Sequence, residues 1–288
     1  MTALATLPAR RRTVAAPSGR RLRGSWFDTV VALVVMAVFL FPIYWMLNVS
    51  LQKGGAAVNT PWLPLHPTLD GYVKAISTQG RPLLTSLAVA SGAVVFSLLI
   101  ASPGAYALAR YKIPGARAVL LALLISQMIP GIVVANALYS TYTSIGLINS
   151  IPGLILADSA LGIPFAMLIL HTFMRSIPDS IVEASWIDGA GPVRTFTAVV
   201  LPMSRNAVVT SALFTFLFAW GDFLFALTLT ATADKRPITL SLYTFIGAFV
   251  ADWSSVMATA VLASLPAIVL LVIAQRYVAA GVSAGAVK

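Results

Sequence analysis

Long apolar stretches, separated by short polar segments, make up most of the chain. A helix needs about 20 mostly apolar residues to cross the ~30 Å hydrocarbon core of a bilayer. Stretches of that length cover residues 27–49, 83–108, 118–137, 152–173, 206–229 and 256–277. The pattern therefore predicts an all-α membrane protein with six transmembrane helices.

The amino-acid composition supports the same class. Hydrophobic residues make up 59% of the 288 residues and charged residues only 10%, whereas charged residues are about 25% of a typical soluble domain. A water-soluble protein of this size could not cover its surface with so few charges. The chain also has no Cys, which excludes disulfides, zinc–thiolate sites, iron–sulfur clusters and a thiol nucleophile.

The positions of Lys and Arg predict the orientation of the six spans, because positive charge concentrates on the cytoplasmic side of membrane proteins. Fourteen of these 19 residues lie before the first span, in the second and fourth loops, or in the tail, and five lie in the remaining loops. We therefore expect both termini in the cytoplasm. Residues 1–26 carry six Arg and no acidic residue, and we interpret them as a membrane-orienting segment rather than a nucleic-acid arm.

The expected domain organisation follows from the spans. Residues 27–277 form the transmembrane domain, and residues 278–288 form a cytoplasmic tail. The loop 175–205 is the most polar segment between two spans on the predicted cytoplasmic side. This loop is therefore the first place to look for a function.

The loop 175–205 contains signals for a short helix. Pro178, Asp179 and Ser180 supply a helix start, and Glu183 follows Ser180 at the spacing of a capping box. These signals predict a helix from about Ser180 to Asp188.

Glycine and proline residues then predict a turn and a second helix. Gly189 and Gly191 would end the first helix, and Pro192 would open the next. Ala184 and Ser185 give the first helix a surface of small side chains that permits close approach of a partner. The alternative is an amphipathic helix on the bilayer surface, with Ile181, Trp186 and Ile187 in the membrane.

The sequence of this loop resembles the EAA signature, E-A-A-x3-G-x9-I-x-L-P, of permease subunits in bacterial ABC importers. The matching residues are Glu183, Ala184, Ser185, Gly189, Val199, Leu201 and Pro202. The wider string EASWIDGAGPVRTFTAVVLP is similar to the version in maltose-type carbohydrate permeases. Ser185 stands in place of the second Ala and Val199 in place of Ile.

Three further segments resemble the same family, in the same order along the chain. They are AYALARYKIPGAR at residues 105–117, WGDFLF at residues 220–225, and AGVSAGAVK at residues 280–288. Gly221 departs from the Asn that is common at this position of the family. The resemblance covers residues 83–288 and leaves out the Arg-rich start and the first outer loop.

The resemblance implies the fold and the partners of the chain. It implies a type I ABC importer permease fold in the bacterial plasma membrane and a transport subunit without catalytic activity, cofactor or bound metal. The implied partners are a second homologous permease, two cytoplasmic ATPase subunits, an extracytoplasmic solute-binding protein, membrane lipid and a carbohydrate substrate. No Gly-Lys-Ser/Thr phosphate loop occurs in the chain, so hydrolysis of ATP by that route falls to the partners.

The resemblance also implies where the ATPase subunits bind. The residues expected to couple to them are Glu183, Ala184, Ser185, Asp188, Gly189, Leu201 and Pro202. A second contact is expected from the tail, at Gly281, Ala284, Gly285 and Ala286. For the tail, a frayed and solvated terminus is the alternative.

Polar residues within the spans are the candidates for the substrate pathway. Amide and hydroxyl groups can exchange hydrogen bonds with sugar hydroxyls, aromatic rings can stack on sugar faces, and an ionisable group in a span is costly unless it has a use. The candidates are Gln127, Asn136, Ser159, Trp220, Asp222 and Phe223. The alternatives are helix–helix hydrogen bonding for Gln127, Asn136 and Ser159, a place in the interfacial belt of aromatic residues for Trp220, and an ion pair with Lys235 or Arg236 for Asp222.

Two other functions stay open from the residues alone. One is an ABC permease for a non-sugar solute, although the spans hold few of the charges that such a solute would favour. The other is a six-span intramembrane enzyme, but the chain contains no His-Glu-x-x-His, and its Gly-x-Ser-x-Gly string, at residues 281–285, lies within the tail segment that resembles the permease family.

Overall fold

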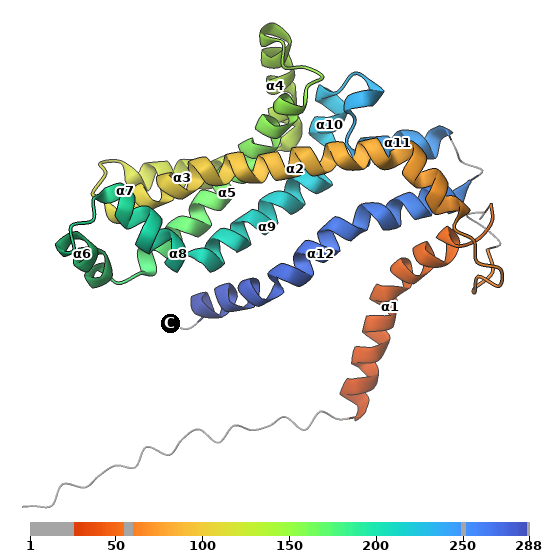
Figure 1. Cartoon of the computed structure of the whole chain (residues 1–288), viewed down its shortest axis with the longest axis horizontal. Coiled ribbons are helices and arrows are strands. Elements are labelled where there is room, and N and C mark those ends of the chain that lie inside the picture. Colours follow the sequence, from red (N-terminus) through yellow and green to blue (C-terminus); the bar gives the residue numbers. More distant parts are fainter. Residues whose placement is uncertain (1–25, 55–59, 249–251, 287–288) are drawn as a thin grey trace, which may run out of the picture. The chain divides into compact units, whose positions relative to one another are not determined.

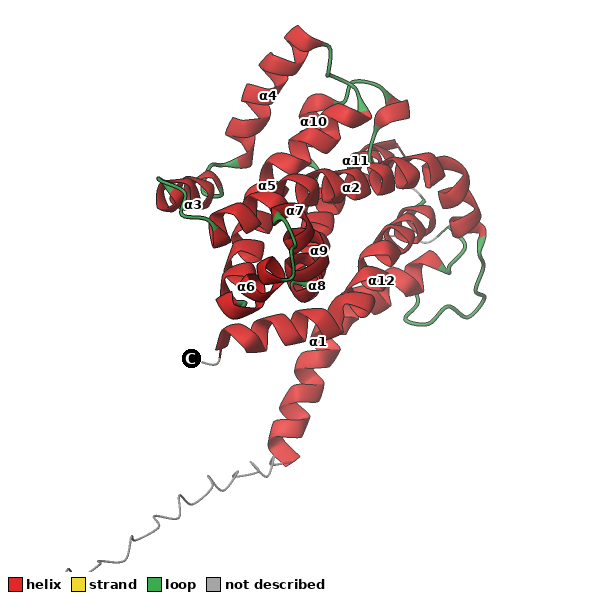
Figure 2. Cartoon of the chain, turned by 60° about the vertical axis from the view of Figure 1, so that its left-hand side comes forward, coloured by secondary structure: helices red, strands yellow, loops and turns green. Residues whose placement is uncertain are grey.

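The computed structural model of the chain describes residues 26–54, 60–248 and 252–286, with side chains described as far as Tyr277. Every regular element in these ranges is a helix (Figures 1 and 2). The chain divides into two compact units, residues 1–44 and 45–288. Four helices are long and apolar enough to cross a membrane, and the number rises to six if each of two bent helix pairs counts as one span.

The described part of the first unit is the beginning of α1 (Trp26–Ser50). This helix has 25 residues, an 18-residue stretch of it has a mean hydropathy of 2.6, and every residue from Trp26 to Tyr44 is exposed. An apolar helix with exposed sides is suited to lipid or to another apolar helix. α1 therefore agrees with the first predicted span.

The second unit is a helix bundle built on α2 (Asp70–Arg110), which has 41 residues. α2 packs against α5 (Ile151–Ser176), α9 (Arg205–Gly221) and α12 (Trp253–Ala286) (Figure 1). The remaining elements are α3 (Ala116–Ser126), α4 (Gly131–Ile145), α6 (Asp179–Ile187), α7 (Pro192–Thr195), the π-helical η1 (Phe196–Val200), α8 (Leu201–Met203), α10 (Leu224–Leu229), the 3-10 helix η2 (Ala233–Lys235) and α11 (Ile238–Ala248).

Small side chains allow the central helices to approach closely. On α2, Ala90, Ala93, Ala101 and Ala105 are fully buried. On α5, a Cβ atom added to Gly162 would lie 2.7 Å from the Ser97 Oγ on α2 and from the Thr215 Cγ2 on α9. Helices in membranes pack through such small residues because the lipid offers no hydrophobic driving force between them.

The third predicted span is broken in the structure. Instead of one helix over residues 118–137, α3 and α4 meet at an angle of 98°. Pro130 lies at the N-cap of α4 with φ −58° and ψ 131°. Because proline lacks an N–H group and disfavours the α conformation in the residue before it, a helix cannot continue through this position without a bend.

The fifth predicted span, residues 206–229, also differs from the structure. α9 ends at Gly221, Asp222 is extended with φ −63° and ψ 130°, and α10 follows as a separate helix. On the other side, residues 192–203 and α9 meet at an angle of 77°. The second, fourth and sixth predicted spans lie within α2, α5 and α12.

Candidate functional site

The loop that carries the EAA resemblance folds as two short helices, α6 and α7, joined by a tight turn. The expected helix over Ser180–Asp188 is confirmed with a shift of one residue. The expected capping box does not form, since Pro178 is the N-cap and no side chain caps α6. The earlier start places Ser180 inside the helix, two positions past the N-cap, where its hydroxyl cannot cap.

The turn after α6 requires glycine at position 189. Gly189 has φ +80°, in the left-handed region that side chains with a Cβ atom disfavour. Its N–H donates to the Trp186 carbonyl at 3.0 Å, and the Ala190 N–H donates to the Ser185 carbonyl at 2.9 Å. These bonds satisfy carbonyls that a helix end leaves free, so the direction of the chain toward α7 depends on Gly189.

The structure places Ser185 inside the loop rather than on its surface. Its residue exposure is 8%, and its hydroxyl donates to the Val182 carbonyl at 2.7 Å. The Ser185 and Thr195 hydroxyls lie 3.0 Å apart, and Thr195 on α7 is fully buried. The serine that departs from the family pattern therefore joins the two helices to each other, with its hydroxyl bonded inside the loop.

The remaining motif residues on α6 and its turn form an exposed surface, comprising Glu183, Ala184, Asp188 and Gly189. Two apolar side chains are highly exposed beside them, Ile187 at 87% and Val193 at 76%. A cavity of about 180 Å³ opens nearby and is lined by Ser185, Asp188, Ala190, Arg194, Ala198 and Val199. Val193 lies between the fixed positions of the motif, so the sequence motif alone did not indicate it.

The last two motif residues and the tail lie elsewhere. Leu201 packs against the buried cluster that includes Val200, and Pro202 is exposed. Both line an apolar groove of about 640 Å³ between α2 and α9, whose one charged residue is Arg205. In the tail, the backbone of α12 continues to Ala286, but the side chains of Gly281, Ala284, Gly285 and Ala286 lie outside the described residues.

Two of the pathway candidates make contacts between helices. The hydroxyl of Ser159, which is fully buried, donates to the Ile155 carbonyl at 2.6 Å and lies 3.5 Å from the Ala93 carbonyl on α2. The Trp220 Nε1 donates to the Ala263 carbonyl on α12 at 3.0 Å, and its ring stacks on Phe216. The contacts of Ser159 agree with its helix–helix alternative, and the contact of Trp220 likewise joins two helices, α9 and α12.

Asp222 caps a helix. Its carboxylate accepts the N–H groups of Phe225 at 3.2 Å and Ala226 at 3.0 Å, which are the free donors at the start of α10. The Asp222 carboxylate therefore caps α10 and does not form the ion pair with Lys235 or Arg236 that was its alternative role. The signal for the cap was present in the sequence, because aspartate is one of the residues preferred at the start of a helix. The continuous apolar stretch 206–229 led to the prediction of one unbroken span instead.

The other pathway candidates are more accessible. Gln127 is half-buried at the break between α3 and α4, and Asn136 is exposed on α4. The half-buried Phe223 contacts Tyr243 on α11, with ring centroids 5.4 Å apart. Among the described residues, no group of three His, Cys, Asp or Glu side chains is placed to hold a metal ion.

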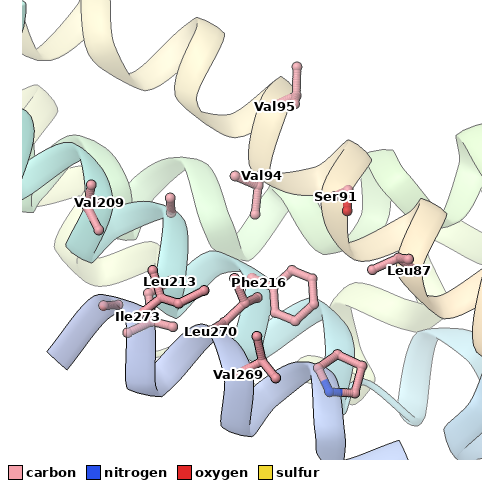
Figure 3. Close-up of a pocket in the computed structure, with 13 residues that line it drawn as sticks. Leu87, Ser91, Val94, Val95, Val209, Leu213, Phe216, Val269, Leu270 and Ile273 are labelled. Atoms are coloured by element: carbon pink, nitrogen blue, oxygen red, sulfur yellow. The ribbon is translucent and has the colours of Figure 1, made fainter.

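A second groove, of about 510 Å³, lies between α2, α9 and α12 (Figure 3). Aliphatic side chains such as Leu87, Val94 and Ile273 line it, together with Phe216, and Ser91 is its polar residue. A sugar needs several hydrogen-bond partners, so this groove is suited to an apolar helix or a lipid chain instead.

Comparison with known proteins identifies close relatives. Residues 93–284 match the family described as "Binding-protein-dependent transport system inner membrane component". The chain is 32% identical over 270 residues to the trehalose transport system permease protein SugB of Mycobacterium tuberculosis, with 92% of this chain and 98% of that protein covered. It is 30% identical to the diacetylchitobiose uptake system permease protein DasC of Streptomyces coelicolor, with 93% and 99% covered.

The fold also matches a solved structure. A chain in the crystal structure of a bacterial ABC transporter involved in the import of the acidic polysaccharide alginate superposes with a TM-score of 0.74 at 22% identity. The match covers 88% of this chain and 98% of that chain. At this identity the likeness concerns the fold.

Proposed function

The chain belongs to the family of binding-protein-dependent transport system inner membrane components, and on that premise we propose that it is the permease of an ATP-driven importer for a carbohydrate. It is a non-catalytic membrane subunit, and ATP is hydrolysed on separate subunits. The observation that carries the carbohydrate is the similarity, over more than 90% of the chain, to permeases named for trehalose and diacetylchitobiose. We propose a sugar or oligosaccharide of that kind.

We propose six crossings with both termini in the cytoplasm. The crossings would be α1, α2, the bent pair α3–α4, α5, the bent pair formed by residues 192–203 and α9, and α12. The distribution of Lys and Arg supports this orientation. It places α6 on the cytoplasmic side and the turn between α4 and α5 outside.

The exposed surface of α6 is the proposed contact with the ATPase subunit. Support comes from the motif, from the exposure of Glu183, Ala184, Asp188 and Gly189, and from the exposed apolar Ile187 beside them. Ser185 and Thr195 would hold α6 against α7 from within. Leu201 and Pro202 would then support the loop rather than contact the ATPase, and the tail is a separate proposed contact.

The further proposed partners are a second homologous permease and an external solute-binding protein. One of the solved relatives is an alginate ABC transporter in complex with an alginate pentasaccharide-bound periplasmic protein. The substrate pathway would run between the two permeases, with Gln127 and Asn136 as the accessible polar candidates on this chain.

Co-purification from native membranes tests the coupling surface. The wild-type chain, tagged at its N-terminus, should recover an ATPase subunit and a second permease. Glu183→Arg reverses a charge on the exposed surface, and Gly189→Val puts a β-branched residue at φ +80°, so both should lose most of the ATPase and keep the second permease. Asp234→Asn, on the exposed helix η2, is the control. Full recovery of the ATPase with both loop variants would refute the coupling surface.

Uptake measurements test the substrate class. Cells that lack the gene and cells that carry it are compared for uptake of radiolabelled trehalose, diacetylchitobiose and maltose, and of a polyamine and phosphate as the non-sugar alternatives. Gene-dependent uptake of a sugar, abolished by Gly189→Val, is the expected result. Gene-dependent uptake of the polyamine or phosphate alone would favour the non-sugar permease.

A further inference from the structure

Arg110, the last residue of α2, connects three segments at the end of the bundle that carries α6. Its Nη1 donates to the Asp179 Oδ1 at 2.6 Å, and its Nη2 donates to the carbonyls of Met174 at 2.5 Å and Ile177 at 2.6 Å. The Arg110 side chain is only 4% exposed, whereas that of Asp179 is 86% exposed. The acceptors belong to the last turn of α5, to the connection after it, and to the first residue of α6.

The connection between α5 and α6 depends on these bonds. α5 ends at Ser176, and Ile177 is extended with φ −68° and ψ 128° before Pro178. The last carbonyls of a helix have no partner within the helix, and buried carbonyls must find one elsewhere. A guanidinium group supplies two donors in one plane and a positive charge at the negative end of the helix dipole. Arg110 therefore determines the angle at which the chain leaves α5 and enters α6.

The second half of the loop is attached to the same end of α2. Tyr106, one turn before Arg110, is buried, and its ring lies 5.2 Å from that of Phe196 in η1. Val182 on α6 and Val200 on η1 are buried in the same cluster as Tyr106. Both halves of the loop thus pack on the end of α2.

We propose that Arg110 is the positioning residue that makes α6 and α2 move as one body when the ATPase displaces α6. The proposal rests on the proposed function, because it takes α6 as the ATPase contact. α2 has 41 residues, which is about 60 Å of helix at 1.5 Å per residue, with Pro82 and Pro103 inside it. At its far end, Lys74 is ion-paired with Asp252 immediately before α12, at 2.6 Å. Through α2, a movement of α6 reaches the opposite end of the bundle.

A distance measurement across the junction tests this proposal. The chain has no Cys, so cysteines introduced at Ser180 on α6 and Leu99 on α2, both exposed, are the spin-labelling sites of this subunit. Pulsed electron spin resonance is recorded on the purified complex with its permease and ATPase partners in nanodiscs, without nucleotide and with ATP trapped by vanadate. With Arg110 present, the distance should be the same in both states.

Variants of the junction show whether Arg110 positions α6 relative to α2 or only caps the end of α5. Arg110→Gln should let α6 follow the ATPase while α2 stays, so the distance should differ between the two states by about 2–5 Å, within the range of helix displacements in switching proteins. Arg110→Lys, whose ammonium keeps the charge but lacks the planar fork that spans the carboxylate and the two carbonyls, should give a smaller shift, and Asp179→Asn the smallest. Lys112→Gln, an exposed position two residues further on, is the matched control and should behave as wild type.

The outcomes distinguish this proposal from the proposed function. An unchanged distance in both states with Arg110→Gln, in a complex that still binds the ATPase, would overturn the role of Arg110 and leave the coupling surface intact. If the complex with Arg110→Gln fails to assemble, the Arg110→Lys and Asp179→Asn variants provide the test. Wild-type distances in both of these variants would overturn the role of Arg110. If Glu183→Arg leaves the ATPase bound, the coupling surface itself fails.

Discussion

The two ends of α2 are both tied to a neighbouring segment by an ion pair, but the two pairs have different surroundings. At the α6 end, the Arg110 cation is almost completely buried and its carboxylate partner, Asp179, is exposed. At the α12 end, the Lys74 and Asp252 side chains are both partly exposed, at 40% and 28%. A partly exposed pair contributes little to stability because solvent screens it.

This difference shows which parts of each junction matter. At the α6 end, the two backbone carbonyls that Arg110 satisfies are more important than the exposed carboxylate. At the α12 end, Asp252 also accepts the N–H of Ser255 at 3.2 Å and its hydroxyl at 2.9 Å, so it caps α12 as well as pairing with Lys74. The fork of arginine is needed at the first end, whereas a point charge is sufficient at the second.

Exchanging the two cations should give the largest difference between the ends. Arg110→Lys loses at least one bond to a buried carbonyl and should lower the free energy of unfolding by about 2 kcal/mol. Lys74→Arg keeps its charge at a partly exposed site and should change it by less than about 0.5 kcal/mol. Thermal unfolding in detergent, followed by size-exclusion chromatography, measures both. Equal losses at the two ends would contradict the comparison.

Close packing at the α12 end gives the next largest effect. A Cβ atom on Gly71 would lie 2.5 Å from the Ser254 Oγ and 3.0 Å from the Ser254 backbone oxygen. Gly71→Ala should therefore push the start of α12 away from α2 and cost about 1–2 kcal/mol.

Gly80→Ala is the matched control for Gly71→Ala. Gly80 lies in the same helix and has nothing within 4 Å of an added Cβ atom. Alanine there should raise stability by up to about 1 kcal/mol, because it stiffens the helix without a clash. The same thermal assay compares the two variants, and a loss at Gly80 equal to that at Gly71 would show that packing is not the cause.

The long apolar stretches predicted the class of protein and most of the helices, because membrane thickness sets a length that is easily recognised in a sequence. They did not predict the break at Pro130 or the one at Asp222, since hydropathy averages over a window and does not respond to a single backbone position. The helix-start residues of the loop 175–205, its glycines and Pro192 predicted α6, the turn at Gly189 and the helix opened by Pro192. These depend on local backbone preferences, which the sequence carries directly.

The sequence could not predict the contacts that depend on backbone atoms far along the chain. Arg110 lies in the segment AYALARYKIPGAR, but the sequence assigned it no partner. Two of its acceptors are backbone carbonyls, and their accessibility depends on where α5 ends. Ser185 looked like a surface residue because serine and alanine are similar in size. Its burial follows from the position of Thr195, ten residues later, which is known only once α7 is folded back.

Removing the charge of Lys74 should have a small effect that depends on salt. Lys74→Gln loses the pair with Asp252 and should cost about 0.5 kcal/mol at low ionic strength. The difference from wild type should shrink at 1 M salt, where the Debye length falls to about 3 Å. Thermal unfolding at both salt concentrations measures this. Asp252→Ala, which also removes the cap of α12, should cost more and depend less on salt.

The pH dependence of the same pair should be the smallest effect. Burial raises the pKa of Asp252, but donation by Lys74 and Ser255 outweighs it, and the pKa of this carboxyl lies below its ordinary value. A pKa that is lower in the folded state stabilises the fold above the ordinary value of about 3.9, and this stabilisation is lost as the pH falls through the lower, folded-state pKa. The difference in unfolding temperature between wild type and Asp252→Asn should therefore be constant from pH 7 to 5 and decline below pH 4. Other carboxyl groups titrate equally in both proteins and cancel in the difference. A decline that begins near pH 6 would therefore mean that a group other than Asp252 determines the pH dependence of stability at the start of α12.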